Sequence, residues 1–314
     1  MTEWFRRAGT TARDGLDLAI SPGEPGKPGE PGEPGWEHTG LHIVTLGAGQ
    51  THRVETGDSE WIALSLNGSA RVTCGSETAE LRGRRDVFSG PSDLAYVPIG
   101  SSFTVTSEEG ARIALPHARA SKAFPFAYIE DVPVELRGAG LASRQVNNFG
   151  VPGVLDADSI IACEVLTPSG NWSSYPPHKH DEDRPGKESV LEEIYYFELR
   201  NDNGAEGNDP MGYLQVYGDG IDVLAQTRTG DVVLVPHGWH GPAMAPPGYD
   251  LYYLNVMAGP GAERAWLICD DPSHAWVRGT WETQKTDPRL PFGHMTWGDD
   301  PPGPPRFAAD GGQA

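Results

Sequence analysis

The chain has 314 residues, with 24 basic and 44 acidic side chains and a formal net charge of −20. This surplus of negative charge repels the phosphates of nucleic acid and of anionic lipid, so neither is expected as a partner. The length is comfortable for two packed domains. The 40 glycines and 28 prolines exceed the share found in average globular proteins, which favours short strands and many turns.

The cellular compartment is inferred from features that the sequence lacks. No apolar run approaches the roughly 18 residues that a membrane-spanning helix needs, and the residues after Met1 do not resemble a signal peptide. Cys74, Cys163 and Cys269 are spaced neither as a zinc motif nor as a disulfide framework. We therefore expect a soluble, cytoplasmic protein with reduced, structural cysteines.

Residues 1–35 are predicted to form an N-terminal segment with a Gly/Pro-rich insert. From Gly23 to Gly35 every third residue is glycine, and a proline precedes each glycine after the first. A collagen triple helix would need many more triplets and partner chains. The repeat therefore predicts an extended, solvated loop of polyproline type.

Two strand-rich blocks follow at 36–125 and 156–285, joined by a connector at 126–155 with one edge strand and followed by a tail at 286–314. Short runs of Val, Ile, Leu and Thr alternate there with turn-forming Gly, Asp, Ser and Pro. The predicted strands are Leu41–Leu46, Glu60–Leu66, Ala70–Thr73 and Phe103–Thr106, then Ile160–Leu166, Glu193–Leu199, Met211–Tyr217, Val232–Val235 and Leu251–Met257. We predict an all-β protein of two domains.

One turn motif occurs in both blocks. Pro98 and Gly100 end a hydrophobic strand of the first block, and Pro236 and Gly238 end one of the second. This recurrence indicates a duplicated β-barrel with diverged copies, although a single shared tripeptide can also arise by chance.

The second block contains a group of candidate metal ligands. His178 and His180 are two residues apart, so along an extended strand their imidazoles project from one face and Lys179 points the other way. A carboxylate follows at Glu192 or Glu193. We favour Glu193 because it directly begins an aromatic, strand-like run.

A third imidazole comes from His237 or His240, which follow the predicted strand Val232–Val235. Three imidazoles and one carboxylate suit Zn, Fe, Mn, Ni or Cu, whereas calcium prefers oxygen ligands throughout. The sequence therefore predicts one site for a divalent transition-metal ion.

The His-x-His pair, the later Glu and the stretch Gly-(five residues)-Pro-x-Gly ending in His resemble the two motifs of the cupins, small β-barrels that hold one metal ion. The first block has no His-x-His pair, and Phe103 stands where the second motif has its histidine. The resemblance implies a bicupin of two cupin-type β-barrels with a metal site in the C-terminal barrel only. It favours His240 over His237, and the implied ligands are His178, His180, Glu193 and His240.

Longer strings are similar to the 5-deoxy-glucuronate isomerases of myo-inositol catabolism, and the similarity covers roughly residues 36–285. They lie at 171–181, 191–197, 248–259 and 271–276. The resemblance implies a small sugar acid as substrate and an aldose–ketose isomerisation through an enediol, which interconverts 5-deoxy-D-glucuronate and 5-dehydro-2-deoxy-D-gluconate. The related 4-deoxy-5-ketouronate isomerases bind zinc through four equivalent ligands, so zinc is the first expectation for the metal, with manganese or iron as alternatives.

Such a reaction needs a group that moves a proton and a cation that binds the substrate carboxylate. Tyr252 is predicted to move the proton, although the sequence does not select it over neighbouring candidates, namely Tyr175, Glu192, His237 and Asp250. Arg144 is predicted to bind the carboxylate, because strand alternation turns Lys179 away from the metal.

Two other functions fit the same ligand pattern. A cupin iron dioxygenase can use these four ligands, and a non-catalytic sugar-binding bicupin can hold a structural metal. Turnover without oxygen would distinguish the isomerase from the oxygenase, and turnover itself would exclude the binding protein. A homo-oligomer is also compatible with a bicupin that has exposed edge strands.

Overall fold

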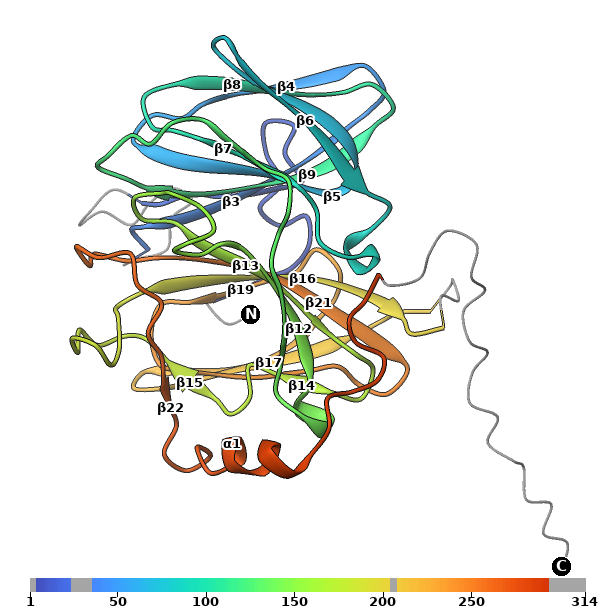
Figure 1. Cartoon of the computed structure of the whole chain (residues 1–314), viewed down its shortest axis with the longest axis vertical. Coiled ribbons are helices and arrows are strands. Elements are labelled where there is room, and N and C mark those ends of the chain that lie inside the picture. The colour runs from blue at the N-terminus through green and yellow to red at the C-terminus, as the bar shows by residue number, and fades with distance from the viewer. Residues whose placement is uncertain (1–3, 24–35, 204–207, 294–314) are drawn as a thin grey trace, which may run out of the picture.

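The computed structural model of the chain describes residues 4–23, 36–203 and 208–293, and strands make up nearly all of its regular structure (Figure 1). The predicted polyproline-type loop at 24–35 and the tail from residue 294 lie outside these residues. Figure 1 shows two bodies of strands, one blue to teal and the other green to red. We call them the N-terminal body and the C-terminal body.

The N-terminal body is built on a nine-stranded sheet of order β10-β7-β5-β9-β3-β2, in which β6 and β8 also pair with β5 and β4 pairs with β8. Its strands are β2 (Leu18–Ile20), β3 (Thr39–Leu46), β4 (Gln50–Glu55), β5 (Ser59–Cys74), β6 (Glu77–Arg84), β7 (Leu94–Val97), β8 (Ser102–Ser107), β9 (Ala111–Arg119) and β10 (Ala127–Ile129). The 3-10 turn η1 (Val87–Ser89) lies between β6 and β7.

The C-terminal body has a seven-stranded and a six-stranded sheet. The seven-stranded sheet has the order β1 (Phe5–Arg6), β19 (Val232–Val235), β16 (Glu192–Asn201), β21 (Tyr249–Ala258), β13 (Ile161–Thr167), β12 (Arg144–Gly150) and β11 (Val134–Arg137). The six-stranded sheet has the order β18 (Ile221–Thr227), β17 (Gly212–Gly218), β20 (Trp239–Met244), β15 (His178–Lys179) and β22 (Cys269–Asp270), with β14 (Trp172–Ser173) beside β20. Helical structure is limited to η2 (Gly140–Ala142), α1 (Val277–Thr280) and η3 (Trp281–Thr283).

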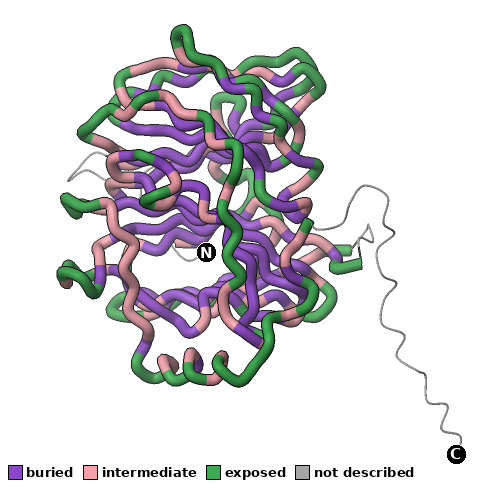
Figure 2. The backbone as a smooth tube through the Cα atoms, viewed as in Figure 1, coloured by how far each residue is buried: buried purple, intermediate pink, exposed green. Residues whose placement is uncertain are grey.

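The central strands β13, β16 and β21 are buried on both faces because three apolar cores lie side by side, and Figure 2 shows buried backbone running through both bodies and between them. One core fills the N-terminal body, a second fills the C-terminal body, and a third joins them. On β16, Tyr195 and Phe197 belong to the core inside the C-terminal body, whereas Ile194 and Tyr196 belong to the core between the bodies. The two-residue period of the strand therefore decides which core a side chain enters.

Two buried glutamates bind the backbone of the opposite body. Glu60 on β5 accepts hydrogen bonds from the backbone N–H groups of residues 158–160 at 2.6–2.9 Å. Glu192 on β16 accepts hydrogen bonds from the backbone N–H groups of residues 37–39 at 2.5–3.0 Å. These reciprocal contacts satisfy donors that would otherwise be buried without partners.

A buried ion pair also crosses between the bodies. Arg84 of β6 donates two hydrogen bonds to the carboxylate of Glu164 on β13, and both side chains are at most 3% exposed. Asn147 and Tyr252 donate to the same carboxylate at 2.9 and 2.7 Å. The charges are thus paired and hydrogen-bonded, as burial requires.

The predicted strands agree with observed strands to within one residue at their first positions or lie inside them, with two local differences. The runs Glu60–Leu66 and Ala70–Thr73 belong to one strand, β5, whose register shifts between Ser65 and Asn67 against β9. The connector at 126–155 contains three strands, β10, β11 and β12, where one edge strand was expected. Within the described residues, no helix has both the length and the apolar character needed to cross a membrane.

Candidate metal centre and cavity

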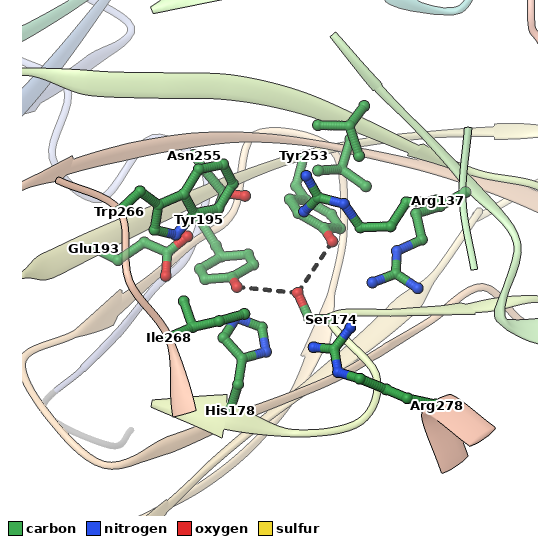
Figure 3. Close-up of a pocket in the computed structure, with 13 residues that line it drawn as sticks. Arg137, Ser174, His178, Glu193, Tyr195, Tyr253, Asn255, Trp266, Ile268 and Arg278 are labelled. Atoms are coloured by element: carbon green, nitrogen blue, oxygen red, sulfur yellow. Dashed lines mark hydrogen bonds between the residues drawn. The ribbon is translucent and has the colours of Figure 1, made fainter. Parts of the chain in front are cut away.

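A cavity of about 220 Å³ opens inside the C-terminal body. Strands of the seven-stranded sheet, β15 of the six-stranded sheet, helix α1 and the loop before β22 all contribute to its wall (Figure 3). The lining residues are Arg137, Arg144, Val146, Val165, Ser174, His178, Glu193, Tyr195, Tyr253, Asn255, Trp266, Ile268 and Arg278. Imidazole, carboxylate, guanidinium and hydroxyl groups therefore share one enclosed space.

Three of the predicted metal ligands meet at one point. His180, Glu193 and His240 are buried, and each offers one ligand atom within 4.8 Å of the others. Glu193 Oε2 lies 3.0 Å from His180 Nε2 and 3.1 Å from His240 Nε2. Because Glu193 comes from β16 and His240 from β20, this cluster joins the two sheets of the C-terminal body.

Contacts with the backbone orient all three histidines of the site. Each Nδ1 lies close to a backbone carbonyl oxygen: His178 to Pro176 at 3.3 Å, His180 to Leu191 at 2.9 Å and His240 to Gly238 at 3.2 Å. Since a carbonyl oxygen only accepts, Nδ1 of each ring carries a hydrogen, and in a neutral ring Nε2 then keeps its lone pair. Histidines that bind metals are held in this way by their second nitrogen. His180 differs in that its Nε2 also lies 3.0 Å from Glu193 Oε2; burial alone would lower the pKa of His180, but this hydrogen bond outweighs burial and raises that pKa.

The donor set of this cluster fits a divalent metal ion. His240 Nε2 is buried and has no hydrogen-bond partner, because its approach to Glu193 lacks hydrogen-bond geometry. A buried nitrogen without a partner is unfavourable, and a bound cation would satisfy it together with the carboxylate. Imidazole and carboxylate ligands are those used by Zn, Fe and Mn sites.

The charge states of Glu193 and His178 also suit metal binding. Burial alone would disfavour the Glu193 carboxylate, but its interactions with His180 and His240 outweigh burial and lower its pKa to about 2. Burial, followed by the neighbouring rings of His240 and His180, lowers the pKa of His178 well below its usual value. An ionised carboxylate and a neutral imidazole are the forms that bind metals.

His178 lies beside the three-residue cluster but is not part of it. Its ring centroid is 4.5 Å from that of His240, its strand partner, and 6.4 Å from that of His180. The two rejected alternatives lie elsewhere: Glu192 binds the backbone of residues 37–39, and His237 is exposed. The preference for Glu193 and His240 therefore agrees with the geometry.

Three arginines line the cavity. Arg137 and Arg278 are labelled in Figure 3, on the side away from Glu193. Arg137 donates two hydrogen bonds to Glu135 at 2.9 and 2.7 Å, and Arg278 binds both carboxylate oxygens of Asp270. These two guanidinium groups are therefore already neutralised by carboxylates.

Arg144, the predicted carboxylate anchor, is different. It is 5% exposed, and among the described residues no carboxylate oxygen lies within 4.0 Å of its guanidinium group. Its Nη1 donates to the backbone oxygens of Ala142 at 3.0 Å and Tyr175 at 3.4 Å. Burial is the main cause that lowers the Arg144 pKa to about 10, and the nearby positive charges of Arg137 and Arg278 add to it. The cavity therefore favours an anion next to Arg144.

Tyr252 does not line this cavity. Its side chain belongs to the core between the bodies, where its hydroxyl donates to Glu164 at 2.7 Å. The next residue on β21, Tyr253, lines the cavity instead. The physical reason is strand alternation, which turns neighbouring side chains to opposite faces. Tyr252 is thus not placed to move a proton at this site.

Sequence reasoning did not select several of the lining residues. Ser174 lies 3.0 Å from the Tyr195 hydroxyl and 3.1 Å from the Tyr253 hydroxyl (Figure 3). Burial raises the pKa of Tyr253 to about 12, so this phenol is protonated at neutral pH. Only the register of β16 against β21 places Tyr253 on the face of Glu193, and the sequence contains no local signal for it.

Curled antiparallel sheets around a buried group of imidazoles and a carboxylate define the class of cupin-like proteins. In agreement, the structure of oxalate decarboxylase from Bacillus subtilis is similar in fold, with a TM-score of 0.58 and 14% identity over 86% of this chain and 80% of that chain. An IolB-like protein from Salmonella typhimurium LT2 is nearer, with a TM-score of 0.77 and 32% identity over 87% of this chain and 98% of that chain.

The chain belongs to the KduI/IolB family, whose model matches residues 28–277. It is 43% identical over 250 residues to the 5-deoxy-glucuronate isomerase of Geobacillus kaustophilus, which covers 77% of this chain and 86% of that protein. It is 38% identical over 241 residues to the 5-deoxy-glucuronate isomerase of Bacillus subtilis strain 168, covering 75% and 86%. The predicted family is therefore confirmed.

Proposed function

We propose that this protein is an aldose–ketose isomerase that interconverts 5-deoxy-D-glucuronate and 5-dehydro-2-deoxy-D-gluconate. The observation that carries the proposal is a single cavity that combines an imidazole–carboxylate cluster with a buried arginine that has no carboxylate partner in the described chain. A six-carbon sugar acid has a carbonyl at one end and a carboxylate at the other. Its two ends thus match the two kinds of group in the cavity.

We propose His178, His180, Glu193 and His240 as the ligands of one divalent metal ion, with zinc as the first candidate and manganese or iron as alternatives. The cluster of the last three residues and the neighbouring ring of His178 support this set. When bound, such an ion polarises a carbonyl group and stabilises the negative charge of an enediolate.

The side chains of the cavity would bind and orient the substrate. Arg144 offers a planar guanidinium group for bidentate hydrogen bonding to the carboxylate, in a buried place where such a bond is strong. The hydroxyls of Tyr195 and Tyr253 offer hydrogen bonds to the substrate oxygens. Binding at both ends would hold the reacting carbons in one position, which is how orientation accelerates a reaction.

We also propose that the two bodies are two cupin-type barrels, at 36–125 and 156–285, and that only the C-terminal barrel binds metal. The registers support a duplication: Trp61 pairs with Val97 before Pro98 in the first body, as Glu193 pairs with Val235 before Pro236 in the second. Trp61 thus occupies the position of Glu193.

The surroundings of Trp61 support the loss of the first site. Its ring stacks on His117 at 3.8 Å between centroids and lies 6.1 Å from the ring of Phe103. The indole of Trp61 therefore fills the position at which the C-terminal body has the Glu193 carboxylate, and this position holds no charged ligand. This agrees with the prediction that Phe103 replaces the motif histidine.

The function is tested by incubating the metal-loaded protein with 5-deoxy-D-glucuronate in deuterated water without oxygen and following the product by NMR. We expect the ketose isomer, of unchanged composition apart from deuterium, and deuterium at the carbon that receives the proton supports an enediol. Binding without turnover would favour a sugar-binding protein. Turnover that requires oxygen would favour a dioxygenase.

A matched pair of variants connects the activity to the proposed site. His240→Ala should lose both bound metal and activity while keeping its fold. His237→Ala removes an exposed imidazole three residues away and should keep both. Full activity of His240→Ala would refute the ligand assignment.

A further inference from the structure

Three hydroxyl groups form a continuous chain at the wall of the cavity. Ser174 Oγ lies in the middle, 3.0 Å from the Tyr195 hydroxyl and 3.1 Å from the Tyr253 hydroxyl, and all three residues line the cavity (Figure 3). The two phenols come from neighbouring strands, β16 and β21, and Ser174 comes from the turn after β14. This chain of hydroxyl groups thus connects strands and a turn that come together only in the folded protein.

In two arrangements of the protons, both hydrogen bonds of this chain run in the same direction. A hydroxyl group has one proton to donate and two lone pairs to accept. Two hydrogen bonds within the chain use two of its three protons, so the third points away from whichever tyrosine ends the chain. Reversing both hydrogen bonds moves this outward proton from one tyrosine to the other.

We propose that the chain Tyr195–Ser174–Tyr253 transfers the hydroxyl proton between the two oxygens of the substrate during isomerisation, with Ser174 as its central link. This inference rests on the proposed isomerase function. In an aldose–ketose conversion, a proton moves between adjacent carbons, and a second proton leaves the hydroxyl oxygen and reaches the former carbonyl oxygen. The chain accounts for this second transfer.

The transfer balances without a co-reactant. One tyrosine gives its proton to the carbonyl oxygen and receives a proton from Ser174. Ser174 in turn receives a proton from the other tyrosine, and that tyrosine receives the proton of the substrate hydroxyl. Each O–H bond that breaks is replaced by one that forms, and all three side chains end neutral with the direction of their hydrogen bonds reversed. The tyrosines contact the substrate, whereas Ser174 acts through them as a positioning residue.

The backbone of Ser174 favours a functional over a structural explanation of its side chain. Its φ is 45°, in the left-handed region where glycine is the least strained residue. A Cβ on Gly241 would lie 1.9 Å from the Ser174 carbonyl oxygen, so this turn is packed closely against β20. Glycine would adopt this backbone conformation with less strain than serine. The presence of serine is therefore explained by its hydroxyl group.

Two substitutions distinguish these explanations. Ser174→Ala removes the hydroxyl and leaves a methyl group that keeps water out, whereas Ser174→Gly removes it and leaves room for a water between the two phenols. We expect kcat to fall on the order of 10- to 100-fold in Ser174→Ala and less in Ser174→Gly, with KM and metal content within about twofold of wild type. The midpoint of thermal unfolding should not follow the ranking of kcat among the three proteins, because Ser174→Gly should be at least as stable as wild type.

Controls separate backbone strain from proton transfer. Asp14 is an exposed residue with φ 52°, so Asp14→Gly and Asp14→Ala should reproduce the stability effects and leave kcat unchanged. Tyr253→Phe interrupts the same chain of hydroxyl groups. The kcat of the double variant Ser174→Ala/Tyr253→Phe should therefore be no lower than the kcat of the less active single variant. The solvent deuterium isotope effect on kcat should change in Ser174→Ala and stay at the wild-type value in the Asp14 variants.

The outcomes are separable. A kcat within twofold of wild type in Ser174→Ala would overturn the relay while the isomerase function stands. Multiplicative losses in the double variant would also contradict it. A wild-type protein that binds metal but does not isomerise the sugar acid would overturn the proposed function itself.

Discussion

Arg144 gives the sharpest test of the proposed site, because its replacement should change stability and activity in opposite directions. The side chain is 5% exposed and lies near two other guanidinium groups. A fall of its pKa from 12.5 to about 10 means that the folded protein disfavours the charged side chain by about 3 kcal/mol. At neutral pH the group is charged both folded and unfolded, so this cost is present in full.

Arg144→Met should therefore stabilise the substrate-free protein. The variant relieves the buried charge but leaves the carbonyl oxygens of Ala142 and Tyr175 without their donor, which costs about 1 kcal/mol for each hydrogen bond. We expect a net gain of about 1 kcal/mol, which raises the midpoint of thermal unfolding by about 2–4 °C for a domain of the size of the C-terminal body.

The same variant should lose most of its activity. Removing one member of a buried charge pair costs about 2–5 kcal/mol, which corresponds to a fall in kcat/KM of about 30-fold to several thousand-fold. Arg144→Lys keeps the charge but loses the planar fork, so its loss should be smaller. Ligand-induced stabilisation by a hexuronate should be large in wild type and nearly absent in Arg144→Met.

Scanning calorimetry with and without hexuronate, together with steady-state kinetics, measures both effects. Arg53→Met is the matched control, because Arg53 pairs with Glu55 on an exposed edge of the N-terminal body and should change neither quantity greatly. An Arg144→Met protein that is less stable than wild type and equally active would refute the reasoning, because Arg144 would then be a structural residue.

Further predictions concern the metal and the contact between the bodies. Glu193→Gln should reduce bound metal at least tenfold, as measured by elemental analysis after dialysis against a weak chelator. Arg84→Met leaves the Glu164 carboxylate buried without its cation and should lower the free energy of unfolding by about 3–5 kcal/mol in urea titrations. Tyr252→Phe should lower stability by about 1 kcal/mol and keep kcat within about threefold, because the lost hydroxyl binds Glu164 outside the cavity; a hundredfold loss of kcat would restore Tyr252 as a catalytic candidate.

Most of the proposed ligands could be selected from the sequence because local spacing determines where their side chains point. His178 and His180 are two residues apart at a strand, and Glu193 begins a strand whose aromatic content is evident from the sequence. A strand carries its side chains to a known face, so short spacings along it are informative. The spacing placed His178 and His180 on one strand face and the aromatic run favoured Glu193, whereas the choice of His240 over His237 depended on the resemblance to cupins.

The error at Tyr252 has a physical cause. The strand Tyr249–Ala258 is apolar along most of its length because one face packs inside the C-terminal body and the other packs against the N-terminal body. A strand buried on both faces shows no alternation of polar and apolar residues. The sequence therefore gave no means of telling Tyr252 from Tyr253.

The cationic side of the cavity could not be predicted because it depends on distant segments. Arg137 lies on β11 and Arg278 on helix α1, about 140 residues apart in sequence, and no local spacing connects them. Arg144 was predicted, but the feature that distinguishes it, the absence of a nearby carboxylate within the described structure, is visible only after folding.

The two bodies show how one β-framework can support different chemistry at one register position. Trp61 and Glu193 each pair with the residue that precedes a Pro-x-Gly turn, so the backbone presents both side chains alike. In the first body an uncharged indole fills the space, stacked on the His117 ring, and its Nε1 donates to the backbone oxygen of Thr56 at 3.3 Å. In the second a carboxylate is buried there, and burial of that charge is tolerable only when cationic or hydrogen-bonding groups surround it. The histidines around Glu193 therefore support the stability of the C-terminal body as well as its chemistry, because they compensate the buried charge of Glu193.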